Sequence, residues 1–284
     1  MKFLVMGANG MAGHTICLYL KESGHDVTGF DLRKSPIVKT YAGNAQDKDK
    51  LKEIIENGNF DYIINAIGLL NQAAEDNKSA AVYLNSYLPH LLCDFTSDSK
   101  TSIIHMSTDC VFSGKNGKYT EHSLRDGETF YDRTKALGEI EDGKNITFRN
   151  SIVGPDMNEN GIGLFNWFMK QQGPINGYTK VMWTGLTTLQ LAKTMERAAK
   201  EHITGLYNMV YKENISKYDL LMLFNKYFKD GKTVINAYDG AQADKTLVRT
   251  NFNFDYIIPD YEKMVSDMAD WVKKHKELYP HYNL

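Results

Sequence analysis

A glycine-rich turn between an apolar strand and an amphipathic helix constrains the fold more than any other feature of the sequence. Residues 2–6 are a short apolar run, and Gly7, Gly10 and Gly13 follow at three-residue spacing before a helical pattern begins. The first glycine permits the bend, the second lets a pyrophosphate approach the backbone, and the third lets the helix pack on the strand. The helix N-terminus then offers free N–H groups to the phosphates. The commoner fingerprint is GxGxxG, so the position of the turn, more than its spacing, predicts dinucleotide binding.

The rest of the first half repeats the alternation of short apolar strands and amphipathic helices. Strands are expected at 2–6, 26–30, 62–67, 102–106 and 145–150, and helices at 47–56, 79–95 and 129–141. This order is typical of right-handed βαβ units in a parallel sheet. The sequence therefore predicts an α/β fold, a Rossmann-type doubly wound parallel sheet over residues 1–155.

Beyond Pro155 the alternation gives way to a region punctuated by glycine. Helical patterns return at 188–200, 216–228 and 260–275. We interpret residues 156–284 as a smaller mixed α/β substrate-binding region, interleaved with the first domain and covering the carboxyl edge of its sheet.

Charge and composition exclude several classes of protein. The 33 Lys and Arg against 35 Asp and Glu give a net charge of −2, whereas nucleic-acid-binding proteins normally carry a basic excess. No run approaches the roughly 20 apolar residues of a membrane span, and the first apolar run is too short for a signal peptide. Three scattered cysteines suggest no disulfide framework, and the histidines show no metal-binding spacing. We expect a cytoplasmic protein without a catalytic metal.

Asp31 lies 18 residues beyond Gly13, near the roughly 20-residue offset of a carboxylate that binds the adenosine ribose of NAD. Arg33 and Lys34 stand beside it and could instead pair with the 2′-phosphate of NADP. Asp31 could also merely cap a turn. The cofactor is therefore expected to be NADPH or NADH, with the choice left open.

Tyr131 and Lys135 lie four residues apart in a helical stretch and share one face. The hydroxyl of Thr108 comes directly after the strand at 102–106, and ligands of open parallel sheets bind at the carboxyl ends of strands. Reducing a carbonyl requires a proton on oxygen. A phenol holds one at neutral pH, and a nearby ammonium lowers its pKa towards the range useful for general acid catalysis. These residues predict a site of carbonyl reduction.

Together these motifs resemble the extended short-chain dehydrogenase/reductases. The run 107–114 (STDCVFSG) and the pattern from Tyr131 through Lys135 to Glu139 are similar to the dTDP-4-dehydrorhamnose reductase group. The resemblance implies an NAD(P)H-dependent reductase of the C4 ketone of a nucleotide-activated 6-deoxysugar, in polysaccharide or glycan precursor biosynthesis. It places the catalytic set on Thr108, Tyr131 and Lys135.

The pattern and the resemblance together give two sets of expected binding residues. The cofactor is expected at Gly7, Asn9, Gly10, Met11, Gly13, Asp31, Leu32, Arg33, Asn44, Ala45, Asn65, Ala66, Ile67, Tyr131 and Lys135. The substrate is expected at Thr108, Asp109, Cys110, Asn150, Trp183 and Arg249.

This chain departs from the group at three positions. At the position of Cys110 the group usually has a tyrosine, and at Ile152 it often has a tryptophan. At Asn44 many relatives have an aspartate that faces the adenine. The first two changes leave the identity of the sugar open. An N-acetylated UDP-sugar is as compatible with these residues as dTDP-rhamnose.

Two further interpretations remain open. An epimerase or dehydratase of the same fold would retain NAD and regenerate it, and a regulatory Rossmann subunit would act without catalysis. Intact Thr108, Tyr131 and Lys135 argue against the latter. The expected partner is the nucleotide-sugar substrate, with no nucleic acid and no membrane, and a homodimer is left open.

Overall fold

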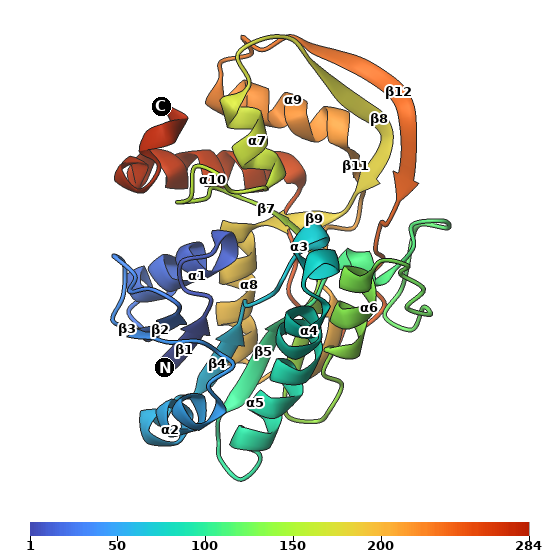
Figure 1. Cartoon of the computed structure of the whole chain (residues 1–284). Coiled ribbons are helices and arrows are strands. Elements are labelled where there is room, and N and C mark those ends of the chain that lie inside the picture. Colours follow the sequence, from blue (N-terminus) through green and yellow to red (C-terminus); the bar gives the residue numbers. More distant parts are fainter. Residues whose placement is uncertain (284) are drawn as a thin grey trace.

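Seven parallel strands form the central sheet of the computed structural model, which describes residues 1–283 (Figure 1). Their order is β10-β6-β5-β4-β1-β2-β3. The strands are β1 (Lys2–Met6), β2 (Asp26–Asp31), β3 (Thr40–Ala42), β4 (Tyr62–Asn65), β5 (Ser102–Met106), β6 (Ile146–Arg149) and β10 (Gly205–Asn208). Every neighbouring pair in this sheet is parallel. The predicted Rossmann-type sheet is confirmed.

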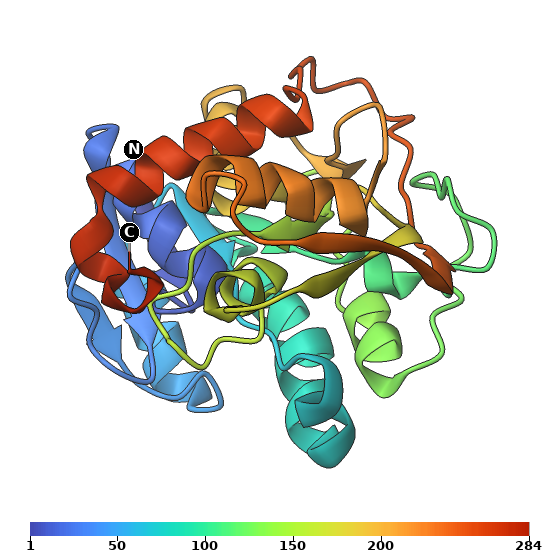
Figure 2. The same cartoon turned by 90° about the horizontal axis from the view of Figure 1, so that it is seen from above.

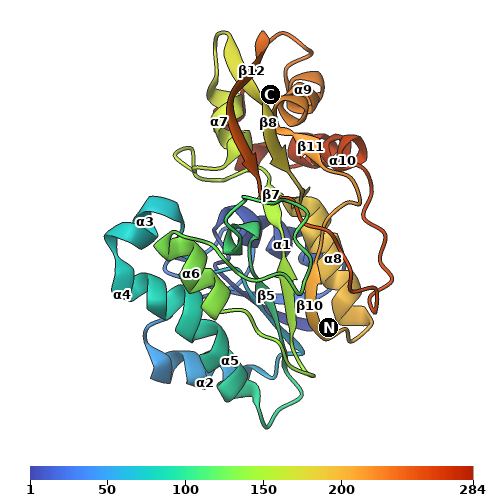
Figure 3. The ribbon, with the colours of Figure 1, turned by 90° about the vertical axis from the view of Figure 1, so that its right-hand side faces the viewer.

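Helices cover both faces of this sheet, because alternate residues of each strand point to opposite sides. In β1, Phe3 and Val5 join the apolar cluster under α1 (Met11–Glu22) and α8 (Thr188–Lys200). Leu4 and Met6 join the cluster under the helices on the opposite face. Those helices are α2 (Lys48–Gly58) and α5 (Leu88–Thr96). α6 (Phe130–Leu137) lies on the same side, and Figure 3 shows the two layers edge-on. A buried parallel sheet of this kind explains the near-continuous apolar runs in the sequence.

The helix predicted at 79–95 contains a π-helical segment. It consists of α4 (Lys78–Ala81), a π-helix (Val82–Tyr87) and α5, in one continuous rod. The π segment turns Asn85 inward, where its side chain is buried and bonds Leu69 and Thr134. Apolar periodicity cannot reveal one widened turn, which is why the sequence predicted an unbroken α-helix.

Two other elements end earlier than their sequence patterns suggested. β4 stops at Asn65 because the Asn65 side chain accepts a hydrogen bond from the Ile67 amide (3.2 Å). α6 stops at Leu137, and Gly138 caps it. A Cβ at Gly138 would lie 1.9 Å from the backbone oxygen of Asn85. Only glycine can bring the end of α6 this close to the π segment.

The glycine turn also contains a close backbone contact that leaves no room for a side chain. Gly7 has a φ of +80°, and a Cβ on Gly13 would lie 1.9 Å from the Gly7 carbonyl oxygen. We expect Gly13→Ala to lower the free energy of unfolding in urea by about 1–3 kcal/mol, because neither backbone can move aside without strain. Gly143→Ala is the matched control, since nothing lies within 4 Å of a Cβ there. Equal stability of the two variants would contradict this account of the turn.

The second half of the chain adds two small sheets above the carboxyl edge of the central sheet (Figures 1 and 2). One has the order β11-β8-β12, from β11 (Ile215–Ser216), β8 (Ile175–Trp183) and β12 (Ile235–Asp244). The other pairs β7 (Ser151–Val153) with β9 (Gly185–Thr187). The remaining elements are α3 (Asn71–Asp76), α7 (Leu164–Lys170), α9 (Lys217–Phe228), α10 (Tyr261–Lys274) and 3-10 turns at Asp109–Val111, Lys276–Leu278 and Pro280–Tyr282.

The two halves are interleaved in space. α8 and β10 come from the second half, yet α8 packs on α1, and β10 pairs with β6 at the edge of the central sheet. No helix among residues 1–283 is long and apolar enough to cross a bilayer.

Candidate functional site

A cavity of about 520 Å³ opens at the carboxyl edge of the central sheet. Its floor is formed where β1, β4 and β5 end, with Gly10, Ala66 and Ser107 among the lining residues. β1 lies between β2 and β4, and the chain winds away from it in opposite directions on its two sides. Ligands of open α/β sheets bind at such switch points.

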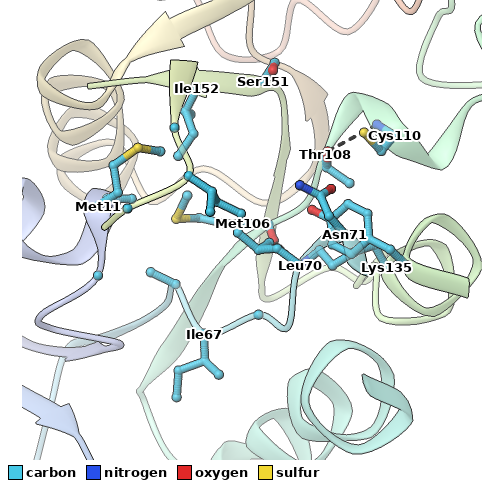
Figure 4. A pocket seen from close by; sticks show the side chains of 18 of the residues that line it. Met11, Ile67, Leu70, Asn71, Met106, Thr108, Cys110, Lys135, Ser151 and Ile152 are labelled. Carbon is cyan, nitrogen blue, oxygen red and sulfur yellow. Dashed lines mark hydrogen bonds between the residues drawn. The ribbon is translucent and has the colours of Figure 1, made fainter. Parts of the chain in front are cut away.

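The three expected catalytic residues meet in this cavity. Thr108 follows β5, and Tyr131 and Lys135 project from one face of α6. All three are buried, with 4–8% of their surface exposed. Thr129 fixes the start of α6 through a capping box with Asp132. Figure 4 shows Thr108, Cys110, Asn71 and Lys135 together on one side of the cavity.

Burial raises the pKa of the Tyr131 phenol above its usual value. The neighbouring Cys110 thiol raises it further, whereas the Thr108 hydroxyl lowers it. Lowering of this pKa by the Lys135 ammonium, as expected from the sequence, stays a prediction. Lys135 Nζ donates a hydrogen bond to the Met106 carbonyl oxygen (2.6 Å). Because burial raises its pKa, the Tyr131 phenol retains its proton at neutral pH.

Burial also lowers the pKa of Lys135, to about 8. The nearby Glu139 opposes this decrease, because its negative charge favours the ammonium form. The lysine that neighbours the phenol is thus held close to the point at which it loses its charge.

A buried ionic network lies beside these residues. Glu139 accepts hydrogen bonds from Ser107 Oγ (2.5 Å) and from Arg149 Nε (2.8 Å) and Nη2 (2.7 Å). Arg125 also pairs with Glu139. Burial disfavours the Glu139 carboxylate, yet the hydrogen bonds and charges hold its pKa below the usual value. Because Ser107 adjoins Thr108, this network fixes the end of β5 that carries the hydroxyl.

The glycine turn has the shape of a phosphate cradle. Gly10 lies opposite the Gly7 carbonyl, with only 3.3 Å available for a Cβ. Asn9 donates its backbone N–H to Asp31 Oδ2 (3.0 Å) and its side-chain amide to the Arg33 carbonyl (3.0 Å). These bonds join the turn to the end of β2, where an adenosine ribose would lie. The residues present fit a dinucleotide.

The expected cofactor residues divide into two groups. Gly10, Met11, Ala66, Ile67, Tyr131 and Lys135 line the cavity itself. The others lie outside the cavity lining, at or near the ends of β1, β2, β3 and β4: Gly7, Asn9, Gly13, Asp31, Leu32, Arg33, Asn44, Ala45 and Asn65. Leu32 is 72% exposed there.

Four of the six expected substrate residues line the cavity, namely Thr108, Asp109, Cys110 and Asn150. Asn150 Oδ1 is buried and has no hydrogen-bond partner within residues 1–283. The structure does not bring Trp183 or Arg249 to this cavity. Trp183 packs against Tyr261, and Arg249 donates hydrogen bonds to the backbone oxygens of Asn251 and Tyr256.

One wall of the cavity is formed by residues that were not predicted from the sequence. Asp156, Asn158 and the run 160–163 line it from the loop between β7 and α7. Asn166 holds this loop by donating its amide to several backbone oxygens, including that of Gly161 (2.7 Å). The polar and glycine-rich run after Pro155 was the available signal, and it was read only as an irregular connection.

Comparison with known proteins gives matches along most of the chain. The model of the family described as RmlD substrate binding domain matches residues 1–253. A probable low-salt glycan biosynthesis reductase, Agl14 of Haloferax volcanii, is 30% identical over 48% of this chain and 46% of its own. A dTDP-4-dehydrorhamnose reductase of Burkholderia thailandensis is 28% identical over 74% of this chain and 72% of its own. The chain spans about half the length of the first curated relatives that it matches.

Solved structures share the fold. A dTDP-4-dehydrorhamnose reductase from Clostridium acetobutylicum superposes with a TM-score of 0.80 at 18% identity, covering 96% of this chain and 100% of its own. The reductase of the same name from Bacillus anthracis, solved in complex with NADP, gives 0.78 at 16% identity, covering 94% and 98%.

Proposed function

The chain belongs to the RmlD substrate binding domain family, and we propose that it is an NAD(P)H-dependent reductase of the C4 ketone of a nucleotide-activated 6-deoxysugar. The predicted resemblance to dTDP-4-dehydrorhamnose reductases is confirmed. The observation that carries the proposal is the meeting of Thr108, Tyr131 and Lys135 in one cavity that Gly10 of the glycine turn also lines. The names of the relatives support a role in making glycan precursors.

In the proposed reaction, Gly10, Met11, Ala66 and Ile67 would hold a reduced dinucleotide, which would supply the hydride for the carbonyl carbon. Tyr131 donates its proton to the carbonyl oxygen, and its raised pKa ensures that the proton is present at neutral pH. Thr108 donates a hydrogen bond to the same oxygen and holds the ketone in place. Lys135 stabilises the phenolate that remains after proton transfer.

The cavity has walls suited to a deoxysugar. Met11, Met106 and Ile152 gather on one side (Figure 4) and offer an apolar surface to the methyl group. Asn150 Oδ1 accepts no hydrogen bond from residues 1–283 and would accept one from a sugar hydroxyl. A buried acceptor without a partner is costly, and a substrate hydroxyl would remove that cost.

The test is a turnover assay with freshly generated 4-keto-6-deoxy nucleotide sugars carrying dTDP, UDP, GDP or CDP. We expect at least one of them to be reduced, with loss of one NADH or NADPH per sugar. Absence of cofactor oxidation across the panel would contradict the proposal. Isomerisation of the sugar by protein that retains its own NAD would establish the epimerase interpretation instead.

A further inference from the structure

The segment 276–282, which contains the two 3-10 turns after α10, lies against α1 (Figures 1 and 2). The end of α10 is joined to the end of α1, because Lys274 Nζ donates a hydrogen bond to Glu22 Oε2 (2.7 Å). Tyr279 then reaches His14, which lies in the first turn of α1. The chain after α10 therefore follows α1 back towards the glycine turn.

His14 connects the segment 276–282 to the glycine turn. Its side chain is fully buried, and burial lowers the pKa of the imidazole to about 4, so the ring is uncharged at neutral pH. Nδ1 lies 2.9 Å from the carbonyl oxygen of Gly10, which can only accept, so Nδ1 carries the ring proton. Nε2 is therefore an acceptor, and the Tyr279 hydroxyl donates to it (2.9 Å). One series of hydrogen bonds thus runs from Tyr279 to the Gly10 carbonyl.

Tyr282 connects the same segment to one wall of the cavity. Its hydroxyl accepts a hydrogen bond from the backbone N–H of Asp156 (2.8 Å), where the loop that lines this wall begins. The buried Tyr282 ring stacks on Tyr279, with centroids 5.7 Å apart, and meets the edge of Phe165 of α7 at 5.4 Å. The two tyrosines are thus packed together, while their hydroxyls bind different elements.

The wall and the glycine turn touch each other. A Cβ on Gly163 would lie 2.8 Å from Met11 Sδ, and both residues line the cavity. Met11 is the first residue of α1, whose N-terminus would bind the pyrophosphate of a dinucleotide. Ile162 also lines this wall and is 69% exposed, so a ligand that fills the cavity would cover an apolar side chain. The segment 276–282 therefore holds both sides of this contact.

We propose that Tyr279 and Tyr282 are positioning residues for the dinucleotide cofactor: the first fixes the carbonyl at the start of α1, and the second fixes the cavity wall against Met11. Both lie outside the cavity lining, so they act through the groups that they hold. A ligand binds more tightly to a site that is already ordered, because less conformational entropy is lost on binding. The proposal goes beyond the proposed function, because it concerns the cofactor and holds whichever sugar is reduced.

The test compares Tyr279→Phe, Tyr282→Phe and the double variant with the unaltered chain, using fluorescence titration of NADPH and NADH. Phenylalanine keeps each ring and removes only the hydroxyl. We expect each single change to weaken binding of the preferred dinucleotide about three- to tenfold, the effect of losing one hydrogen bond. The rate of dinucleotide dissociation, measured by stopped flow, should rise by a similar factor.

Tyr62→Phe is the matched control. Tyr62 is also buried, and its hydroxyl donates to the Ala199 backbone oxygen (3.0 Å) at the amino end of β4, away from the cavity. This variant should lose stability and yet bind the dinucleotide as the unaltered chain does. In preparations that reduce a sugar, the two positioning variants should raise the KM for the cofactor without lowering kcat, since Thr108, Tyr131 and Lys135 are untouched.

The unaltered chain provides a second measurement. Coupling between two sites is reciprocal, so bound dinucleotide should slow hydrogen–deuterium exchange of the backbone amides in the segment 276–282. Unchanged affinity and dissociation rate in the folded double variant would overturn the proposal, and so would equal weakening in Tyr62→Phe. Absence of slowed exchange, or of dinucleotide binding, would overturn it even where the phenylalanine variants fail to fold. A chain that binds the dinucleotide but reduces no sugar contradicts the proposed function alone, because the binding and exchange measurements use only the cofactor.

Discussion

Replacing Tyr131 by phenylalanine should lower kcat by about 10²- to 10⁴-fold, the range that general acid catalysis contributes. The phenyl ring fills the same buried space, so the fold and the Thr108 hydroxyl should keep their places. Affinity for the reduced dinucleotide should therefore stay close to that of the unaltered chain. Steady-state turnover and a cofactor titration on the same protein measure the two quantities.

Tyr178→Phe is the matched control for this experiment. Tyr178 lies on β8, is 39% exposed and does not line the cavity. Its loss of a hydroxyl should leave turnover unaltered. Full activity of the Tyr131 variant would remove the phenol from the mechanism, and a parallel loss of cofactor binding would mean that the ring is structural.

The second large effect concerns stability. Glu139→Gln should lower the free energy of unfolding by about 3–5 kcal/mol, because it leaves Arg149 buried without its counter-ion. Arg149 is fully buried, and the Glu139 side chain is only 1% exposed. Adding Arg149→Met to the same variant should recover part of the loss, since the uncompensated charge is then removed. Urea unfolding measures both.

The destabilisation caused by Glu139→Gln should be largest at neutral pH and should decrease in acid. The folded state lowers the pKa of Glu139, so the carboxylate stabilises the fold above the unfolded pKa of about 4.3. That contribution is lost as the pH falls below this value through the folded pKa. The difference in unfolding free energy between the unaltered chain and the Glu139→Gln variant should then narrow. Glu262→Gln removes an exposed partner of Lys226 and should change stability little. Equal losses in the two variants would mean that burial of the network contributes nothing.

The glycine turn, the strand-end hydroxyl and the Tyr131–Lys135 pair could be predicted because each is encoded locally. A strand followed by three glycines at fixed spacing has few ways to fold, and two residues four apart in a helix share a face. Their meeting in one cavity follows from the parallel sheet, which brings the ends of β1, β4 and β5 to one edge. The catalytic half of the site was therefore accessible from sequence.

The other side of the cavity depends on contacts between distant residues. Nothing local indicates that the loop between β7 and α7 lines the cavity, or that Trp183 and Arg249 lie outside its lining. The π segment at Asn85 and the early end of α6 at Gly138 likewise depend on one close contact between separate helices. The raised pKa of Tyr131 reflects burial, which a motif does not reveal.

The pairing of β10 with β6 governs how the chain can be divided. A polypeptide released after residue 155 would lack the strand at 205–208. β6 would then lie at the edge of the sheet, with a row of its amide and carbonyl groups unpaired. Such open edges recruit other chains, so the amino-terminal half produced alone should aggregate before it binds any nucleotide. During synthesis at the ribosome, the same sheet stays unfinished until some sixty further residues have emerged, which is a window in which a chaperone would be needed.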